Sequence, residues 1–320
     1  MKTQMLLSVT VGLLFTALSP AAPTPEQVAT LHWYQSGDPG FDFAVDGAPF
    51  GVAFDGVHMW VTTDQNKVIK IRAADGKVIN ETLVGTKPHG IAFDGASVWV
   101  ANSGSNSVTR VLAVDPDTVI GSDPSTVLAT ISVSGSPEAV VFDGANVWVT
   151  MGTGSTVAKL AVDTNTVVAN YAVGLNPKGI AFDGTSIWVT NSASGTVSKL
   201  RPADGRLLGS FHVGNQPNSI CYDGTNLWVT LKGSNQVVRI SKTGAILNTL
   251  AVGTQPTGVA FDTTNVWVAN SGAGTVTKIG PVGAPVVIDT FQVGNTPLGV
   301  AFDAAFIWVA NSVDKTMSKR

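Results

Sequence analysis

The sequence predicts an all-β protein, a seven-bladed β-propeller built from four-stranded antiparallel blades. Two observations carry this prediction: a segment that recurs along the chain, and the residue types within it. Seven near-copies begin at Gly51, Gly90, Ala139, Gly179, Ser219, Gly258 and Gly299. Repetition at a period of about forty residues is typical of propellers and solenoids. Within each copy, short runs rich in Val, Ile, Thr and Trp alternate with Gly-, Asn- and Asp-rich turns, which favours strands over helices.

Each copy contains one Trp in its second run and one Asp at the end of its first run. The tryptophans are Trp60, Trp99, Trp148, Trp188, Trp228, Trp267 and Trp308. The aspartates are Asp55, Asp94, Asp143, Asp183, Asp223, Asp262 and Asp303. A residue that every blade repeats serves a need that every blade shares. We therefore expect the Trp to pack between blades rather than to stack on sugars or bases, and the Asp to cap a turn rather than to join a metal ring.

The two ends of the repeat array predict how the ring closes. Residues 41–51 align with the fourth run of the other copies, and the seventh copy stops after its third run. A ring of sheets needs a joint without open edges, so we expect the N-terminal strand to complete the last blade. The recurring T-V-x-K of the third runs, as in Thr196–Lys199, is expected to be an exposed edge.

The remaining chain divides into two short segments. Residues 1–21 have a positive Lys2, an apolar core and small residues up to Ala21, the pattern of a secretory signal peptide, with a retained N-terminal anchor as the alternative. Residues 22–40 form an extension, and residues 41–320 form the propeller. We expect a secreted or periplasmic protein without a membrane span. An insertion in the second copy holds Asp115, Asp117 and Asp123, whose spacing does not fit a calcium loop.

Composition excludes several classes of function. Charged residues make up 13% of the chain and the net charge is −3, which does not suit a nucleic-acid-binding surface. Cys221 is the only cysteine, so no internal disulfide forms, and we expect an ordinary buried thiol. The usual nucleophile, zinc, phosphate-binding and dinucleotide motifs are absent. The sequence identifies no cofactor and no metal site, and we expect a monomer.

Variation among the copies points to a candidate ligand site. The residue that follows the Pro before each first run differs strongly between blades, and a propeller places it at the mouth of its central channel. In blade order these residues are Phe50, His89, Glu138, Lys178, Asn218, Thr257 and Leu298. The ring has a contiguous polar arc and a mostly apolar arc, which suits a small amphiphilic molecule or a peptide. The alternative is that loop residues at the mouth vary because nothing constrains them.

Two further features belong to this candidate site. A His beside a carboxylate is the minimum for general base work, so His89 and Glu138 are the candidate catalytic pair. After the Trp run most blades carry Asn, and Met151 and Leu231 depart from that rule. We expect these two side chains to contact the ligand as well.

The motif W-V-T-N and the loop P-x-G-I-A before each first run resemble known repeats over residues 41–320. They resemble the YVTN-type and NHL-like propeller repeats of exported bacterial proteins, which implies a binding or interaction scaffold without catalysis. More distantly, they are similar to the seven-bladed streptogramin (virginiamycin B) lyases. That resemblance implies a lyase or hydrolase acting on a cyclic or ester substrate, with His89 as base. The chain departs from the lyase repeats, which commonly have an acid after the Trp run, by carrying Asn102, Asn191, Asn270 and Asn311.

Overall fold

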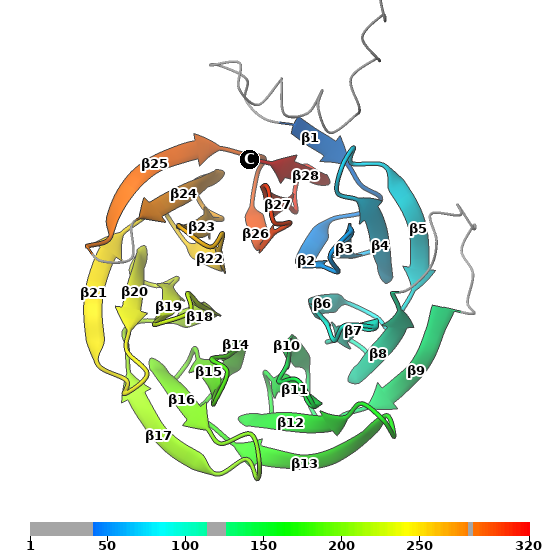
Figure 1. Cartoon of the computed structure of the whole chain (residues 1–320), viewed down its shortest axis with the longest axis horizontal. Helices are drawn as coiled ribbons and strands as arrows, with labels where there is room; N and C mark the ends of the chain where they lie inside the picture. Colours follow the sequence, from blue (N-terminus) through cyan, green and yellow to red (C-terminus); the bar gives the residue numbers. More distant parts are fainter. Residues whose placement is uncertain (1–40, 114–125, 281–283) are drawn as a thin grey trace, which may run out of the picture.

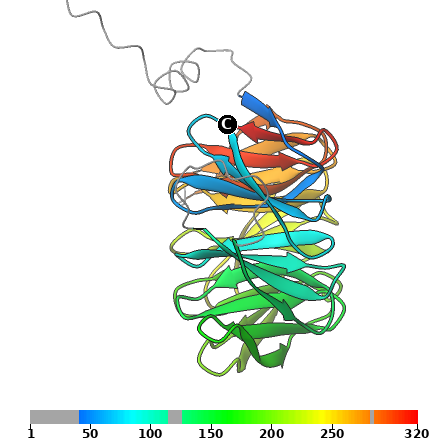
Figure 2. The ribbon, with the colours of Figure 1, turned by 90° about the vertical axis from the view of Figure 1, so that its right-hand side faces the viewer.

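Seven four-stranded antiparallel sheets stand in a ring in the computed structural model (Figures 1 and 2). The structure describes residues 41–113, 126–280 and 284–320. The predicted signal peptide, the N-terminal extension and the aspartates of the insertion lie outside the described residues. Every described element is a strand or a turn apart from one isolated 3-10 residue, and the propeller predicted from the repeats is confirmed. In the part of the chain described, no helix has the length and apolarity to cross a bilayer.

Each sheet is one blade, and in six of the seven its strands run in chain order from the channel outwards. Blade 1 contains β2 (Pro49–Phe54), β3 (His58–Thr63), β4 (Lys67–Arg72) and β5 (Val78–Leu83). Blade 2 contains β6 (Pro88–Phe93), β7 (Ser97–Asn102), β8 (Ser107–Leu112) and β9 (Val127–Ser132). Blade 3 contains β10 (Pro137–Phe142), β11 (Asn146–Met151), β12 (Thr156–Ala161) and β13 (Thr166–Ala172). Blade 4 contains β14 (Pro177–Phe182), β15 (Ile187–Asn191), β16 (Thr196–Leu200) and β17 (Leu207–His212).

The other three blades follow the same plan. Blade 5 contains β18 (Pro217–Tyr222), β19 (Leu227–Leu231), β20 (Gln236–Ile240) and β21 (Ile246–Ala251). Blade 6 contains β22 (Pro256–Phe261), β23 (Val266–Asn270), β24 (Thr275–Gly280) and β25 (Val286–Gln292). Blade 7 contains β26 (Pro297–Phe302), β27 (Ile307–Asn311), β28 (Thr316–Lys319) and, as its outer strand, β1 (Phe41–Ala44).

The ring closes as the sequence predicts. β1 pairs antiparallel with β28, with Phe41 opposite Lys319 and Ala44 opposite Thr316. Figure 1 shows β1, the first strand of the described residues, beside β28, the last. Phe43 of β1 stacks on Trp308 at 5.5 Å between ring centroids, so the borrowed strand contributes side-chain packing as well as ladder hydrogen bonds.

The core consists of seven clusters, each lying between two neighbouring blades. Trp188 of blade 4, for example, packs with Leu227 and Val229 of blade 5, and Trp308 of blade 7 packs with Met59 and Val61 of blade 1. The seven indoles are at most 4% exposed. The packing role predicted for the repeated Trp is therefore confirmed. A blade has no core of its own and is covered only by its neighbours.

The repeated Asp binds both the turn and the indole. In each blade one carboxylate oxygen accepts backbone N–H groups from the two residues that lie two and three positions ahead, as Asp183 does from Thr185 and Ser186. The other oxygen accepts the indole N–H at 2.7–2.9 Å in all seven blades. The predicted turn cap is confirmed, and the same carboxylate also pairs the polar end of a buried Trp.

A cation covers the same Trp on its face. Each Trp lies in the second strand of its blade, and the residue opposite it in the third strand is Lys or Arg. In blade 4, for example, Lys199 pairs with Trp188. All seven cations lie 5.0–5.8 Å from the centre of the Trp ring. In five blades the cation also donates to a backbone carbonyl of the next blade.

This contact corrects the expectation that T-V-x-K marks an exposed edge. Lys159 is 8% exposed, Lys199 and Lys278 are partly buried, and the third strand of each of these blades lies between the second and the fourth. The Lys points to the same face as the Trp, and the next blade covers that face. Its apolar stem therefore lies along the interface while the ammonium group reaches a carbonyl at the far side.

The hydrogen bond from the cation over the Trp to the next blade predicts that Lys199→Met destabilises the ring. Lys199 Nζ donates to the carbonyl oxygen of Lys242 at 2.8 Å, and Met keeps the stem but removes the donor. We expect a loss of about 1–3 kcal/mol in the free energy of unfolding, measured by urea denaturation. Arg206→Met, an exposed cation of the same blade, is the control and should change little. Equal stability of the two variants would contradict a stabilising role for this hydrogen bond between blades.

Candidate functional site

A β-bulge at the start of each inner strand places the variable residue. In blade 4, Pro177 pairs with Asn191 and Ile180 with Val189, so Lys178 and Gly179 together face the single residue Thr190. The same register shift occurs in all seven blades. A bulge bends the strand and re-aims the side chain of the extra residue. The variable residue thus belongs to the strand itself rather than to the link before it, and its side chain projects at the channel mouth.

The glycine after the variable residue permits close packing around the channel. A Cβ on Gly258 would lie 2.2 Å from the carbonyl oxygen of Leu298 in the next blade. Gly51 has the same relation to the carbonyl of His89. Neighbouring inner strands therefore approach backbone to backbone, which fixes the positions of the variable residues relative to one another.

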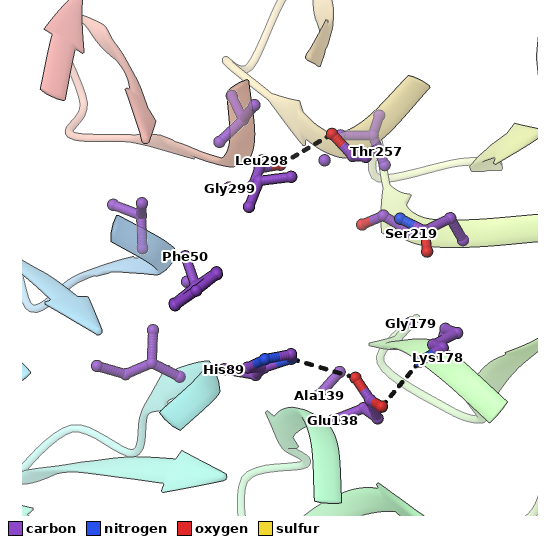
Figure 3. A pocket seen from close by; sticks show the side chains of 18 of the residues that line it. Phe50, His89, Glu138, Ala139, Lys178, Gly179, Ser219, Thr257, Leu298 and Gly299 are labelled. Atoms are coloured by element: carbon purple, nitrogen blue, oxygen red, sulfur yellow. Dashed lines mark hydrogen bonds and ion pairs between the residues drawn. The ribbon is translucent and has the colours of Figure 1, made fainter. Parts of the chain in front are cut away.

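All seven variable residues line a single pocket of about 460 Å³. This volume lies within the usual range for small-molecule sites. Figure 3 shows Leu298, Phe50 and His89 on one side, with Glu138 and Lys178 following along the ring. The lining also includes Val52, Ile91, Val140, Val259 and Val300, which pack mainly between neighbouring blades. The arrangement gives a polar arc and an apolar arc.

The polar arc is organised around Glu138. One of its carboxylate oxygens accepts a hydrogen bond from Lys178 Nζ at 2.7 Å, and the other lies 3.3 Å from Nδ1 of His89 (Figure 3). Gly152, from the loop after β11, leaves room for this carboxylate, since a Cβ there would lie 2.9 Å from Oε1. Burial raises the pKa of the Glu138 carboxyl, but the hydrogen bonds from His89 and Lys178 outweigh burial and hold the pKa below its ordinary value of 4.5.

The apolar arc begins with a ring stack. Phe50 and His89 lie 5.1 Å apart between centroids with 25° between their planes. Leu298 lies on the other side of Phe50 (Figure 3). Thr257 lines the pocket, but its hydroxyl donates to the backbone carbonyls of Pro297 and Leu298 in the next blade. The hydroxyl of Thr257 is therefore not free to bind a ligand.

The structure does not bring Met151 and Leu231 to the pocket. Both are core side chains, at 0% and 2% exposure. The last residue of the second strand turns into its own blade, where Asn191 donates to the hydroxyls of Thr196 and Ser198. Met151 and Leu231 occupy the equivalent space in blades whose third strands carry apolar residues instead of the second hydroxyl, namely Ala158 and Val238. The sequence could have indicated that Met151 and Leu231 are buried, because each has an apolar residue at that position of the third strand.

Sequence reasoning left Lys232 out of the predicted site. Lys232 directly follows Leu231 and lines the pocket from blade 5, the blade that also contributes Asn218. The other blades carry Asp64, Ser103, Gly152, Ser192, Ser271 and Ser312 at this position. A long cation among short residues was therefore visible in the alignment of the copies. The sequence does not show where the Lys232 side chain points, because that depends on how the loop after β19 lies over the channel.

The site residues offer hydrogen bonds and charge rather than a ligand set for a metal. Among the residues that the structure describes, no three His, Cys, Asp or Glu side chains are grouped to hold a metal ion. The chemistry available at the mouth is one carboxylate, one imidazole, two ammonium groups, one amide and the hydroxyls of Ser219 and Thr257, the latter already bonded to the next blade. Cys221 is half-buried and does not line the pocket, and its thiol pKa is raised because desolvation disfavours the thiolate.

The ring of seven blades is shared with known propellers. A streptogramin B lyase superposes with a TM-score of 0.73 at 19% identity, covering 87% of this chain and 96% of that chain. A catalytically inactive virginiamycin B lyase from Staphylococcus aureus with quinupristin gives 0.73 at 18% identity, covering 87% and 97%. Hydrazine synthase from Kuenenia stuttgartiensis gives 0.72 at 18% identity, with the same coverage. No family model and no curated protein matches the chain.

At these identities the similarity concerns the fold. The chain is a seven-bladed propeller of the kind found in the streptogramin B lyases, as the repeat led us to expect.

The pKa of Glu138 predicts a pH-dependent contribution to stability. A carboxyl whose pKa is depressed in the folded state stabilises the fold above its unfolded pKa, and this contribution is lost as the pH falls through the folded pKa. The melting temperature of the wild type should therefore exceed that of Glu138→Gln near neutral pH, and the difference should shrink below about pH 4.5. Asp163→Asn, an exposed charge change at the opposite end of blade 3, is the control. A difference that is constant from pH 3 to 7 would contradict the paired state of Glu138.

Proposed function

We propose that this chain is an exported propeller scaffold that binds a small amphiphilic ligand, or a peptide segment, at the mouth of its channel without chemistry of its own. One observation carries the proposal. The seven residues that vary among otherwise similar blades converge on one pocket, with polar groups on one arc and apolar groups on the other. Concave sites with an apolar lining and a few convergent polar groups are where proteins bind small molecules.

The geometry supports binding in a defined orientation. Phe50 and Leu298 offer an apolar surface, and Phe50 is held in place by its stack on His89. Across the channel, Lys178, Asn218 and Lys232 present polar ends. A ligand with one apolar and one polar end therefore matches both arcs at once.

Export is supported by the pattern of residues 1–21, in which a positive Lys2 precedes an apolar core and small residues up to Ala21. Cell fractionation tests it. Recovery of the chain only in the cytoplasm, with Met1 retained, would contradict this part of the proposal.

The binding proposal predicts a saturable site for an apolar aromatic probe. N-phenyl-1-naphthylamine, which is neutral and fluoresces in apolar surroundings, should bind the wild type with one site per chain. Phe50→Ala should weaken binding about tenfold, since it removes a ring contact worth roughly 1–1.5 kcal/mol. Leu247→Ala, an exposed apolar side chain on the outer strand β21, is the control and should bind the probe as the wild type does. Absence of saturable binding, or equal loss in both variants, would contradict the proposed pocket.

The contact between His89 and Glu138 favours a second candidate function, a lyase or hydrolase of the streptogramin lyase type. An Nδ1–H donated to Glu138 leaves Nε2 of the imidazole unprotonated, which is the tautomer that a general base requires. The pocket beside it accommodates part of a cyclic or ester substrate. The solved lyases of this fold support the candidate only through their shared architecture.

Mass spectrometry of quinupristin incubated with the protein tests this second candidate. Ring opening by elimination gives a linear product of unchanged mass, and hydrolysis gives a product heavier by one water. Under the lyase hypothesis His89→Ala abolishes the product while leaving the melting temperature near that of the wild type. No product from the wild type, or equal product from His89→Ala, would rule out the candidate for this substrate.

A further inference from the structure

The charges at the channel mouth do not balance. We propose that the pocket selects anionic amphiphiles, with an acidic group of the ligand held by Lys232 and Asn218 and a flat apolar group lying over Phe50 and Leu298. This inference rests on the proposed function, because it names the class of ligand that the same pocket takes.

The first step concerns how the one carboxylate of the pocket is used. Both oxygens of Glu138 have partners, Lys178 on one side and His89 on the other. The ion pair neutralises Lys178. Both oxygens of Glu138 are therefore already engaged, and the charge of Lys178 offsets the charge that Glu138 would present to a cationic ligand.

The second step concerns Lys232 in the next blade. Among the described residues Lys232 has no ion-pair partner, although it lines the pocket. The lining holds two lysines and one glutamate, so one positive charge is uncompensated when His89 is neutral. A cleft with charge of one sign and apolar walls concentrates its field, which attracts the opposite charge.

The third step excludes a nearby carboxylate as the natural partner of Lys232. Asp64 occupies the equivalent loop position in blade 1, but it is exposed and does not line the pocket. Its Oδ1 accepts the backbone N–H of Ala48 at 2.8 Å. The aspartates of blades 4 and 5, Asp183 and Asp223, lie at the opposite end of their strands, bound to Trp188 and Trp228.

The fourth step concerns the neighbour of Lys232. The side chain of Asn218 makes no hydrogen bond within the described part of the chain, and it lines the same side of the pocket. An ammonium group and an amide N–H beside each other supply the donors that a carboxylate, sulfonate or phosphate oxygen accepts. Phe50 lies across the channel, in blade 1, so a ligand reaching both must carry its acidic group at one end and its apolar group at the other.

A matched pair of fluorescent probes tests the inference. 1-Anilinonaphthalene-8-sulfonate carries a sulfonate on the same ring system as N-phenyl-1-naphthylamine. At low ionic strength the sulfonate should bind the wild type at least tenfold more tightly than the neutral probe. Lys232→Met should weaken binding of the sulfonate about tenfold and so remove that preference, and Asn218→Ala should reduce it by a smaller factor. Lys87→Met, an exposed lysine at the same end of the propeller outside the pocket lining, is the control and should keep the full preference.

The outcomes separate this inference from the proposed function. If neither probe shows a saturable site sensitive to Phe50→Ala, the proposed function fails and the inference fails with it. If both probes bind at a site sensitive to Phe50→Ala with equal affinity, or if Lys232→Met keeps the preference, the pocket stands and anion selection is wrong. Loss of the preference in Lys87→Met would place the anion site elsewhere and would also overturn the inference.

Discussion

The ring depends on the contact between the Trp of one blade and the inner strands of the next. A single four-stranded sheet of this kind leaves both faces uncovered, so each blade is stable only between two others. The Asp–Trp–cation group makes this contact directional. The carboxylate binds the indole N–H, the indole packs on the following blade, and the cation over the ring reaches that blade's backbone. Repetition of this unit around the axis, including across the joint at blade 7, accounts for a closed ring of equivalent interfaces.

Because packing is satisfied by the repeated residues, the bulge residue of each blade is free to differ. The bulge itself occurs in every blade. It needs only a Pro before the variable residue, a small residue after it, and a Thr or another short side chain opposite in the second strand. In blade 4 the hydroxyl of Thr190 accepts the N–H of Gly179 and donates to the carbonyl of Asn218 in the next blade. The backbone of the channel mouth is therefore rigid, while its side chains determine what it binds. A preorganised rim of this kind lowers the ordering cost that a ligand must offset.

The fold and most of the residues at the channel mouth could be predicted from the sequence, because both follow from comparing the repeats. Repeats reveal which positions every blade needs, so Trp188 and Asp183 were assigned to packing and turn, and the variable residues, such as Glu138, to the mouth. The errors arose where a side chain's direction depends on register. Lys199 reads as an edge residue until its pairing with Trp188 places it on the covered face. Leu231 and Lys232 are adjacent, yet the strand end turns the first into the core and the loop turns the second over the channel.

The borrowed outer strand sets an order for assembly. β1 and β28 are almost the whole length of the described chain apart, and their pairing is the longest-range contact in the sheets. During synthesis on the ribosome six blades can pair within themselves, but the seventh waits for residues 316–319 to emerge. Until then the flank of blade 1 that receives Trp308 lies open to water. The nascent chain therefore carries an uncovered apolar flank through most of its translation, the condition in which slow, long-range β pairing competes with aggregation.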